Sequence, residues 1–444
     1  MNTADPRELI AESPMSRLQI VAVTLCVLLT ALDGFDVLAI SFAAPGIAGD
    51  WGIDRAALGV VLSMELIGMA LGSLLLGNLA DRMGRRRAII GCLVLMSGGM
   101  YLAAIAGDVV TLSAIRMLTG IGIGGMLAAT NAMAAEFSNR RRRHLAVTLM
   151  ASGYPLGAIA GGTIASMLLA HFDWRSVFLF GALATALFLP LVWLWLPESV
   201  DYLVQKRPAR ALEKVNAVLV RMGRDRVAAL PAVSKLQAGS GFRELLSPAL
   251  MRSTLLLTLA YFAHIMTFYF MLKWIPKIVV DMGFAASAAG GVLVWANVGG
   301  AAGALALSLL TQRFDVRALV IGALLLAFAT VTLFGFSPAD LQQLSLLAAL
   351  AGFFTNSAIV GLYAILAQSF PARVRAGGTG LVIGIGRGGA ALGPIVAGLL
   401  FAGGQSLPLV ALVMASGALL AAAALLLLGA PAADKSQLKT CAEA

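Results

Sequence analysis

Two carboxylic acids, Asp33 and Asp36, lie near the middle of a long apolar run from about residue 18 to residue 44. The run is long enough to cross a bilayer, because roughly 20 apolar residues span the hydrocarbon core. Three residues apart on a helix, the two acids share one face, and Gly34 leaves room beside them for a neighbouring helix or a ligand. Two interpretations follow. Either a neighbouring helix satisfies a polar kink, or the acids take up and release protons, since embedded acids generally mark functional sites.

Arg387 is the residue best placed to bind an anion. It lies in the middle of an apolar run between Gly386 and Gly388, keeps its charge at any working pH, and carries a planar fork that fits a carboxylate. A structural ion pair is the competing interpretation, because embedded charges often pair. Lys273 and His264 are further candidates for substrate binding. Snorkelling explains Lys273 equally well, and a packing role explains His264.

Other residues in the apolar runs extend these two candidate sites. Phe35 and Tyr363 are candidates for an aromatic wall around a ligand, although most rings in such helices simply pack. Arg116 and Glu65 are also embedded, and Glu65 either gates the protein or faces an outer vestibule. Because the acids gather in the first half of the chain, we expect that half to carry protons and the second half to attract an anion.

The composition is that of a membrane protein with several spans. Of the 444 residues, 60% are hydrophobic and 12% are charged, and the mean hydropathy is +0.91. The net charge of +10 at pH 7 would suit a nucleic-acid partner. However, the basic residues form short clusters between apolar runs, which is typical of cytoplasmic loops. We therefore expect a lipid bilayer around the chain and no nucleic acid as a partner.

Motifs of several other protein classes are missing from the sequence. No Gly-x-x-x-x-Gly-Lys-Ser/Thr loop occurs, which argues against a built-in ATPase. No His-Glu-x-x-His or Cys-x-x-Cys spacing indicates a metal or redox enzyme. Cys26, Cys92 and Cys441 do not suggest a disulfide framework. We expect no enzymatic activity, no cofactor and no metal site, and we expect an ion gradient to supply the energy.

The apolar runs predict an all-α membrane protein with about twelve transmembrane helices. They form two groups of six, at about 18–44, 56–79, 88–106, 110–136, 145–170 and 175–196, and at about 251–279, 286–310, 316–336, 341–366, 377–402 and 405–429. The predicted domains are an N-terminal tail (1–17), a first half (18–196), a linker (197–250), a second half (251–429) and a C-terminal tail (430–444). Clusters of arginine and lysine follow alternate runs, so both termini and the linker are predicted to be cytoplasmic.

The linker contains apolar residues at helical spacing, namely Leu212, Val215, Val218, Leu219 and Met222, opposite a row of basic residues. This pattern predicts an amphipathic helix on the cytoplasmic membrane surface. We interpret the helix as a tether between the halves, with a binding role as the alternative.

The two halves of the sequence repeat. Eight residues of the first half recur as the same residue type 231 positions later. They are Pro45, Asp50, Gly52, Gly59, Gly68, Gly72, Arg82 and Arg86, which match in order Pro276, Asp281, Gly283, Gly290, Gly299, Gly303, Arg313 and Arg317. Parallel six-span repeats are typical of secondary transporters that rock around a site at the membrane midplane. Glycines spaced by four, at 153, 157 and 161 and at 380, 384 and 388, predict close helix packing.

Three motifs resemble those of the major facilitator superfamily. Gly77-Asn-Leu-Ala-Asp81-Arg82-Met-Gly84-Arg85-Arg86-Arg87 resembles the loop after the second span, and Arg116-Met-Leu-Thr-Gly120-Ile-Gly122-Ile-Gly124 resembles the fourth span. Trp195-Leu-Pro197-Glu198-Ser199 closes the sixth span in the manner of that family. The resemblance implies a cytoplasmic gate formed by Gly77, Asp81, Arg82, Gly84, Arg85 and Arg86, and a role for Arg116 in proton coupling. Asp81 would accept hydrogen bonds from arginines or from a helix N-terminus.

Within that superfamily, the sequence resembles the aromatic acid:proton symporters. Asp33-Gly34-Phe35-Asp36, Glu136-Phe137 with its arginines, Trp274-Ile-Pro276-Lys277 and Gly386-Arg387-Gly388-Gly389 carry this resemblance. It implies proton coupling through Asp33, Asp36, Arg116 and Glu136, and a substrate of the benzoate or hydroxybenzoate kind.

These observations lead to a functional hypothesis. We expect a proton-coupled importer of small organic anions, most simply aromatic carboxylates, which acts as a monomer by alternating access in a bacterial cytoplasmic (inner) membrane. The alternatives are a major facilitator exporter of amphipathic compounds, a passive anion channel, and a transporter-like sensor. A channel would conduct without dependence on the proton gradient, and a sensor would bind its ligand without flux.

Overall fold

The structure of the chain is a computed structural model that describes residues 5–231, 245, 247–248, 250–371 and 374–428. Twelve helices in this part of the chain are long and apolar enough to cross a membrane. This number and their grouping confirm the predicted all-α membrane fold. Of the predicted N-terminal tail (1–17), residues 5–17 are described, and the predicted C-terminal tail (430–444) lies outside the described residues.

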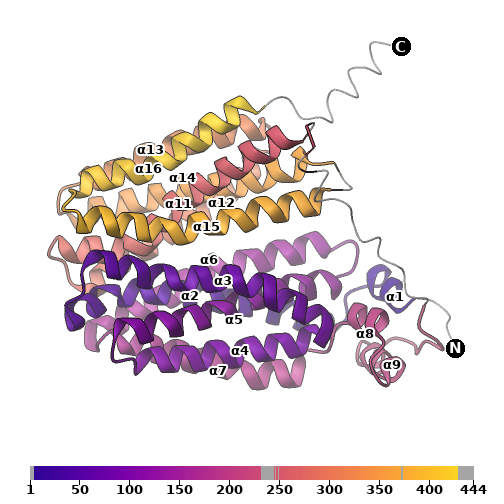
Figure 1. Cartoon of the computed structure of the whole chain (residues 1–444). Helices are drawn as coiled ribbons and strands as arrows, with labels where there is room; N and C mark the ends of the chain where they lie inside the picture. Colours follow the sequence, from indigo (N-terminus) through magenta and orange to yellow (C-terminus); the bar gives the residue numbers. More distant parts are fainter. Residues whose placement is uncertain (1–4, 232–244, 246, 249, 372–373, 429–444) are drawn as a thin grey trace, which may run out of the picture. The chain divides into compact units, whose positions relative to one another are not determined.

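Six of these helices precede the linker and six follow it (Figure 1). The first six are α2 (Arg17–Trp51), α3 (Arg55–Met83), α4 (Arg85–Ala104), α5 (Val109–Glu136), α6 (Arg143–His171) and α7 (Arg175–Trp195). The second six are α11 (Met251–Asp281), α12 (Ala286–Leu310), α13 (Val316–Phe336), α14 (Leu341–Ser369), α15 (Arg375–Ala402) and α16 (Leu407–Leu427). Several begin at an aspartate, because its carboxylate accepts a hydrogen bond from a free backbone N–H of the first turn, as Asp108, Asp315 and Asp340 do.

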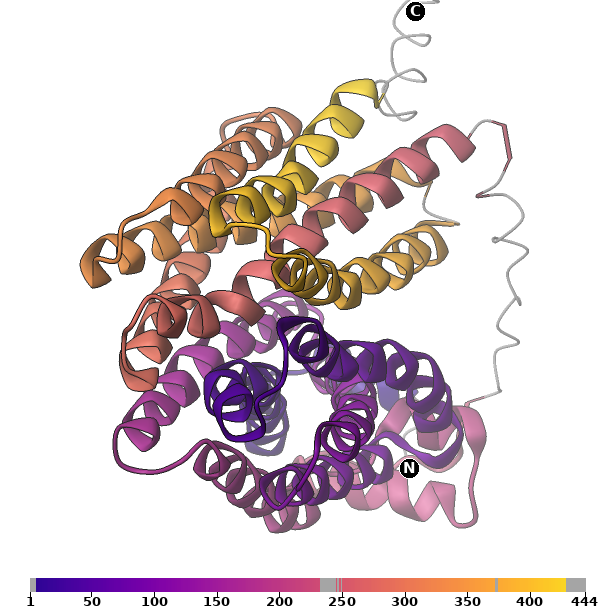
Figure 2. The same cartoon turned by 60° about the vertical axis from the view of Figure 1, so that its left-hand side comes forward.

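The helices form two compact units. Unit 1 consists of Met1–Ala43 and Met64–Leu236, and unit 2 consists of Ala44–Ser63 and Gln237–Ala444. Figure 2 shows the helices of unit 1, coloured indigo to magenta, closer to end-on and as one bundle. The last part of α2 and the first part of α3 therefore pack with the second unit, although they belong to the first half of the sequence.

Close crossings in the two units reproduce the sequence repeat at the level of single atoms. A Cβ atom added at Gly68 or Gly72 of α3 would lie 2.0 Å from Met117 O or 2.1 Å from Ile121 O of α5. The equivalent glycines of α12, Gly299 and Gly303, meet Ala349 O and Phe353 O of α14 at 1.9 and 2.1 Å. Only glycine permits backbones to approach so closely.

The predicted packing glycines of α6 and α15 behave differently. Gly153 and Gly157 of α6 lie against the backbone of α2, at Val27 O and Ala31 O, and Gly161 lies against the ring of Phe35. In α15, by contrast, a Cβ at Gly380 or Gly384 would meet no atom within 4 Å. The prediction was therefore wrong for those two positions. The face of α15 that packs against α11 contains Gly386, Gly389 and Gly393 instead.

The short helices α1 (Pro6–Glu12), α8 (Val200–Lys206) and α9 (Ala211–Arg221) lie together at one end of unit 1 (Figure 1). Val215 and Leu219 of α9 are fully buried. The apolar face of this amphipathic helix therefore packs against protein, and its place at the membrane surface stays a prediction.

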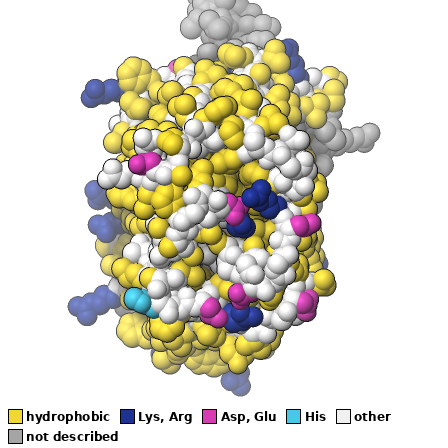
Figure 3. All heavy atoms as spheres, turned by 90° about the vertical axis from the view of Figure 1, so that its left-hand side faces the viewer, with side chains coloured by type: hydrophobic (Ala, Val, Ile, Leu, Met, Phe, Trp, Pro, Cys, Tyr) yellow, Lys and Arg dark blue, Asp and Glu magenta, His cyan; other side chains and the backbone are white. Residues whose placement is uncertain are grey.

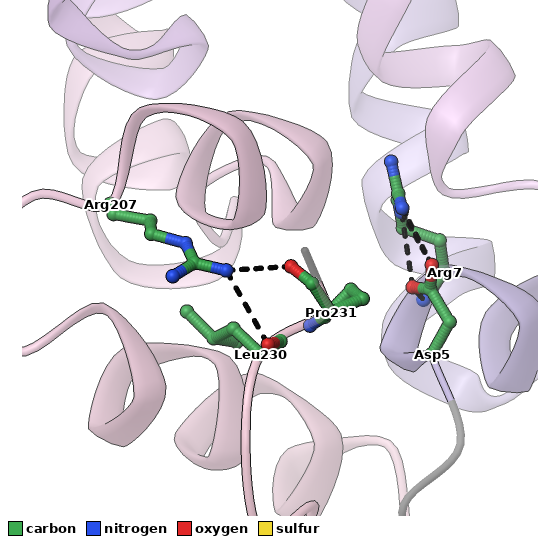
Figure 4. Close-up of polar contacts among 5 residues, drawn as sticks. All are labelled: Asp5, Arg7, Arg207, Leu230 and Pro231. Atoms are coloured by element: carbon green, nitrogen blue, oxygen red, sulfur yellow. Dashed lines mark hydrogen bonds and ion pairs between the residues drawn. The ribbon is translucent and has the colours of Figure 1, made fainter. Parts of the chain in front are cut away.

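Hydrogen bonds hold this assembly together. Arg140 donates its backbone N–H to Ala11 O over 2.7 Å, and Arg224 donates to Pro14 O over 2.8 Å. At the end of α8, Arg207 donates to Pro231 O over 2.6 Å, as Figure 4 shows. Residues 11–14 are thus bonded to the linker and to the loop after α5.

Candidate functional site

Asp33 and Asp36 lie on α2 where that helix crosses α6. The crossing is close because Gly34 and Gly157 have no side chains. A Cβ at Gly34 would lie 2.1 Å from Tyr154 O, and a Cβ at Gly157 would lie 1.7 Å from Ala31 O. Both carboxyl groups are completely buried. The structure therefore places the two predicted proton-coupling acids side by side within the packed interior of unit 1.

The two carboxyl groups have different surroundings. One oxygen of Asp36 accepts a hydrogen bond from Thr185 Oγ1 of α7 over 3.4 Å, and the other has no partner among the residues described. Neither oxygen of Asp33 has a hydrogen-bond partner in the described part of the chain. Gly181 of α7 leaves space here, because a Cβ there would lie 3.4 Å from Asp36 Oδ1. Asp33 is thus the acid whose two oxygens are both available to bind a proton.

Arg116 of α5 lies beside these acids and forms an ion pair with Glu65 of α3. Both side chains are completely buried. Arg116 also donates to Asp36 O over 3.0 Å and to Met100 Sδ over 3.0 Å, and its guanidinium lies 5.4 Å from the centre of the Phe178 ring. Glu65 therefore does not face a vestibule, so that interpretation was wrong, whereas its gating role stays a prediction.

The charges in this buried cluster do not balance. Asp33, Asp36 and Glu65 supply three carboxyl groups, and within the described residues Arg116 supplies the one guanidinium near them. If all three acids were ionised, the cluster would hold two uncompensated negative charges in a medium of low dielectric constant, where burial of even one charge is costly. The arrangement can therefore bind protons.

Arg387 of α15 is the main candidate in unit 2. Its side chain is half-buried, and no ion pair or hydrogen bond ties it to any residue that the structure describes. A guanidinium in the middle of a membrane helix cannot face hydrocarbon without a large cost. Its exposed part must therefore face a water-accessible space, where an anionic ligand can reach it.

Two tyrosines lie close to Arg387. Gly386 packs against the Tyr261 ring of α11, where a Cβ would lie 2.1 Å from Cδ1. The Tyr261 hydroxyl lies 3.0 Å from the Tyr363 hydroxyl of α14. Tyr261 is 4% exposed, whereas Tyr363 is 42% exposed. Arg387 and Tyr363 are thus the two predicted substrate-binding residues that are not buried.

The other three predicted substrate-binding residues are buried. Phe35 packs edge-on against Phe180 with ring centres 5.3 Å apart, and His264 Nε2 donates to Thr355 O over 2.8 Å. This placement favours packing roles for Phe35 and His264. Lys273 is also completely buried, so the snorkelling interpretation of its side chain was wrong.

The predicted gating residues lie at the end of unit 1 that carries α1, α8 and α9. Gly84 precedes α4 with a φ of +104°, which a residue with a side chain rarely adopts. Glu198 accepts a hydrogen bond from the Arg86 backbone N–H over 3.0 Å, and a Cβ at Gly84 would lie 2.4 Å from Glu198 Oε2. The acid at the helix N-terminus is therefore Glu198. Asp81 instead pairs with an arginine, Arg85, at 3.3 Å, which is the other of the two alternatives predicted for it.

Glu136 lies with the gating residues. Arg85 joins Glu136 and Asp81, at 2.8 and 3.3 Å, and the Ser199 hydroxyl donates to Glu136. Glu136 is 20 residues beyond Arg116, about 30 Å along α5, so the structure does not bring it to the buried acid cluster.

The gating candidates Arg82 and Gly77 make longer contacts with their neighbours. Arg82 O accepts a bond from the Tyr202 hydroxyl over 3.4 Å, and a Cβ at Gly77 would make only an ordinary contact of 3.7 Å.

A second charged group lies in unit 2, at the end of α11. Asp281, at the end of α11, pairs with Arg55 of α3 at 2.9 Å and with Lys277. The Arg55 guanidinium also lies 5.4 Å from the centre of the Phe401 ring of α15. All of these residues belong to unit 2. Figure 3 shows one face of the molecule, on which acidic and basic side chains lie among apolar and uncharged ones.

The fold is that of a membrane protein with twelve candidate spans in its described residues, and comparison with known proteins gives its family. The sequence profile described as Major Facilitator Superfamily matches residues 26–314 and 274–442. The chain belongs to this superfamily.

Individual relatives cover nearly the whole chain. This chain is 34% identical over 430 residues to a 4-hydroxybenzoate transporter of Pseudomonas aeruginosa, and the matched region covers 96% of each chain. It is 32% identical to a gallate transporter of Pseudomonas putida, covering 95% of this chain and 94% of the relative. A solved structure of a bacterial homologue of the lysosomal transporter Spinster, 16% identical, covers 92% of this chain and 94% of its own with a TM-score of 0.68, which supports the fold.

Proposed function

We propose that this protein imports small aromatic carboxylates together with protons, by alternating access, as a monomer in a bacterial cytoplasmic membrane with both termini inside. The observation that carries the proposal is the buried acid pair of α2. Asp33 has no hydrogen-bond partner in the described part of the chain, and it lies beside Asp36 in a cluster with more acids than cations. The relatives named above transport 4-hydroxybenzoate and gallate, which supports the substrate class.

In this proposal the two units bind different ligands. Protons bind at Asp33 and Asp36 in unit 1, while the carboxylate of the substrate binds at Arg387 in unit 2. Arg387 suits this role because it offers its fork from a helix where Gly386 and Gly389 bring α15 close to α11. Arg116, held by Glu65, sets the electrostatic field at Asp36.

The cycle follows from these positions. Protonation of the acid pair and binding of the anion occur together on the outer side. The protein then opens to the inside, where the higher pH removes the protons and the substrate leaves. The groups around Glu136, Arg85 and Glu198 close one end of unit 1 during part of this cycle. An importer driven in this way accumulates substrate only when the outside is more acidic.

Uptake into proteoliposomes tests the proposal. Radiolabelled 4-hydroxybenzoate, benzoate and an aliphatic acid of similar size are offered with an inwardly directed proton gradient, with no gradient, and with a protonophore. We expect gradient-dependent accumulation of the aromatic acids only. Flux that does not depend on the proton gradient would indicate a channel. Binding without flux would indicate a sensor, and accumulation with the opposite proton gradient would indicate an exporter.

The anion site is tested by calorimetric titration of purified protein. Arg387→Ala should remove detectable binding of the aromatic acid. Arg387→Lys keeps the charge and loses the planar fork, so it should weaken binding about tenfold, or about 1.4 kcal/mol. The neutral amide of the substrate should bind poorly to the unmodified protein and lose little further affinity in Arg387→Ala. Unchanged binding of the acid by Arg387→Ala would place the anion site elsewhere, with Lys273 as the next candidate.

A further inference from the structure

The hydroxyl groups of Tyr261 and Tyr363 form a pair whose hydrogen-bonding capacity is only partly used. A phenolic hydroxyl has one donor and accepts through its lone pairs. One of the two hydrogens serves the contact of 3.0 Å between the hydroxyl oxygens. The other hydrogen has no protein acceptor among the described residues. The pair can therefore still donate one hydrogen bond and accept others.

The more exposed of the two tyrosines is held in a fixed direction. Tyr363 is 42% exposed, whereas Tyr261 is 4% exposed and packs against Gly386 of α15. The ring centres of the tyrosines lie 5.8 Å apart. A tyrosine near the end of a membrane helix often serves as an interfacial anchor. However, the Tyr363 hydroxyl is bonded to a buried partner on α11, so it points into the helix bundle and not toward a headgroup region.

The pair lies beside the proposed anion site. Tyr261 contacts the residue next to Arg387 in the chain, and the charge of Arg387 acts on the Tyr261 hydroxyl. If Arg387 binds the carboxylate of an aromatic acid, the tyrosine pair is therefore close enough to contact the ring of that acid. A ring with a hydroxyl substituent can satisfy the hydrogen-bonding groups of the pair, whereas an unsubstituted ring leaves them unpaired.

We propose that the tyrosine pair selects aromatic acids that carry a ring hydroxyl. Tyr363 contacts the substrate hydroxyl, and Tyr261 is a positioning residue that orients Tyr363. This inference rests on the proposed function, because it assumes that Arg387 binds the carboxylate. It goes further by naming which ring substituents are recognised and which residues recognise them.

The test measures binding of benzoate, 3-hydroxybenzoate, 4-hydroxybenzoate and 4-methoxybenzoate by calorimetry. The proteins are the unmodified chain, Tyr363→Phe, Tyr261→Phe and the control Tyr101→Phe, which alters a 53% exposed tyrosine of α4 in the other unit. We expect at least one hydroxybenzoate to bind more tightly than benzoate. In Tyr363→Phe this preference should fall roughly fivefold, the effect of one neutral hydrogen bond, while benzoate affinity stays nearly constant.

The remaining outcomes separate the two proposals. Tyr261→Phe should lower the preference less than Tyr363→Phe, and Tyr101→Phe should not change it. Loss of affinity for benzoate and hydroxybenzoates alike in Tyr363→Phe would show a packing role and overturn the inference. A preference that persists in both tyrosine variants would also overturn it and leave the proposed function standing. If none of the acids binds to the unmodified protein, the proposed function itself fails.

Discussion

Glu65 and Arg116 are completely buried and form an ion pair inside a bundle of membrane helices. Such a pair adds little net stability, because the attraction between the charges only offsets the cost of removing them from water. Removing one partner is different, since it leaves the buried group of the other without its ion-pair partner. The pair therefore fixes the charge next to Asp36 and makes the site sensitive to any change at Glu65.

We predict that Glu65→Gln is strongly destabilising. Arg116 would lose its ion-pair partner and keep Asp36 as the neighbouring acid, so the free energy of unfolding should fall by roughly 1–3 kcal/mol, the cost of a buried polar group left without its partner. Thermal denaturation of the purified protein in detergent measures this effect. The matched control is Glu12→Gln, which removes an exposed pair with Arg140 at 4.0 Å and should change stability by less than about 1 kcal/mol. Equal effects of the two substitutions would contradict the argument.

A second prediction concerns the acid pair. Asp33→Asn and Asp36→Asn keep the shape of the side chain but cannot exchange a proton, so gradient-driven accumulation should be lost. Exchange of substrate across the membrane without net transport needs no proton transfer and should persist in at least one variant. Uptake and counterflow assays in proteoliposomes measure both activities. Full accumulation by each single variant would exclude the pair as the proton site.

Sequence reasoning reached some of these residues and missed others, for a physical reason. A charge within an apolar run is visible in the sequence, so Asp33, Asp36, Arg116 and Arg387 could be selected. The pairing of Glu65 with Arg116 depends on which faces of α3 and α5 meet, and the sequence does not state this. The same limit explains why Glu198 was missed as the acid at the start of α4.

At the scale of the element, the crossing of α2 and α6 determines the position of the acids. The backbones approach so closely that the carbonyl oxygen of Tyr154 occupies the place of a Gly34 side chain. Any side chain at that position must push the two helices apart. Asp33 and Asp36 would then move relative to Thr185 and Gly181 of α7.

We therefore predict that Gly34→Ala abolishes transport and lowers stability. The expected destabilisation is roughly 1–3 kcal/mol, which is typical of overpacking in a tight interior. Transport assays and thermal denaturation provide the measurements. Gly91→Ala is the control, because a Cβ at Gly91 of α4 would meet nothing within 4 Å. That change should preserve transport, since alanine favours helix more than glycine does. Normal transport by Gly34→Ala would show that the crossing can relax.

Element-level prediction had its own limits. The spacing of apolar residues in α9 is the same whether its apolar face meets lipid or protein, so the sequence could not show that α9 packs on unit 1. Glycine spacing likewise does not state which glycines of α15 lie at a helix contact. Gly380 and Gly384 are spaced like packing glycines but meet no neighbour.

At the scale of the whole molecule, the repeat in the sequence was the strongest predictor of the fold. Hydrophobic length gave twelve helices, and the displacement of 231 gave two equivalent groups of six. The structure shows why the repeated glycines are necessary. Gly72 and Gly303, which are 231 residues apart, both admit a backbone carbonyl oxygen at 2.1 Å from the position of a Cβ atom. The division into units, with 44–63 placed in unit 2, was not visible in this pattern.

The contacts of α3 within unit 2 give a prediction at this scale. Arg55 and Asp281 join the start of α3 to the end of α11, and Leu58 beside them is 1% exposed. Asp281→Asn removes the ion pair and should open this contact more often. A cysteine at position 58, in a chain without its other cysteines, should then react faster with a maleimide. We expect an increase of up to about fivefold, because an exposed pair contributes up to about 1 kcal/mol.

The control for that experiment is Asp173→Asn in the same cysteine background. Asp173 lies in the loop between α6 and α7 and is 3.9 Å from Arg175, with 60% of its side chain exposed. It should not change the labelling rate at position 58. An equal increase in both variants would indicate a general loosening of the protein, and no increase in either would show that the Arg55–Asp281 pair does not hold α3.

The path of α2 and α3 through both units has a mechanical consequence. Each helix is continuous, yet α2 passes from unit 1 to unit 2 after Ala43, and α3 passes back between Ser63 and Met64. Any rotation of one unit against the other must therefore bend these two helices. Pro45 lies two residues beyond the first of these points and has no N–H to bond to Ser41 O, so the bending stiffness of α2 is lowest there. The elasticity of α2 and α3 thus contributes to the energy difference between any two arrangements of the units.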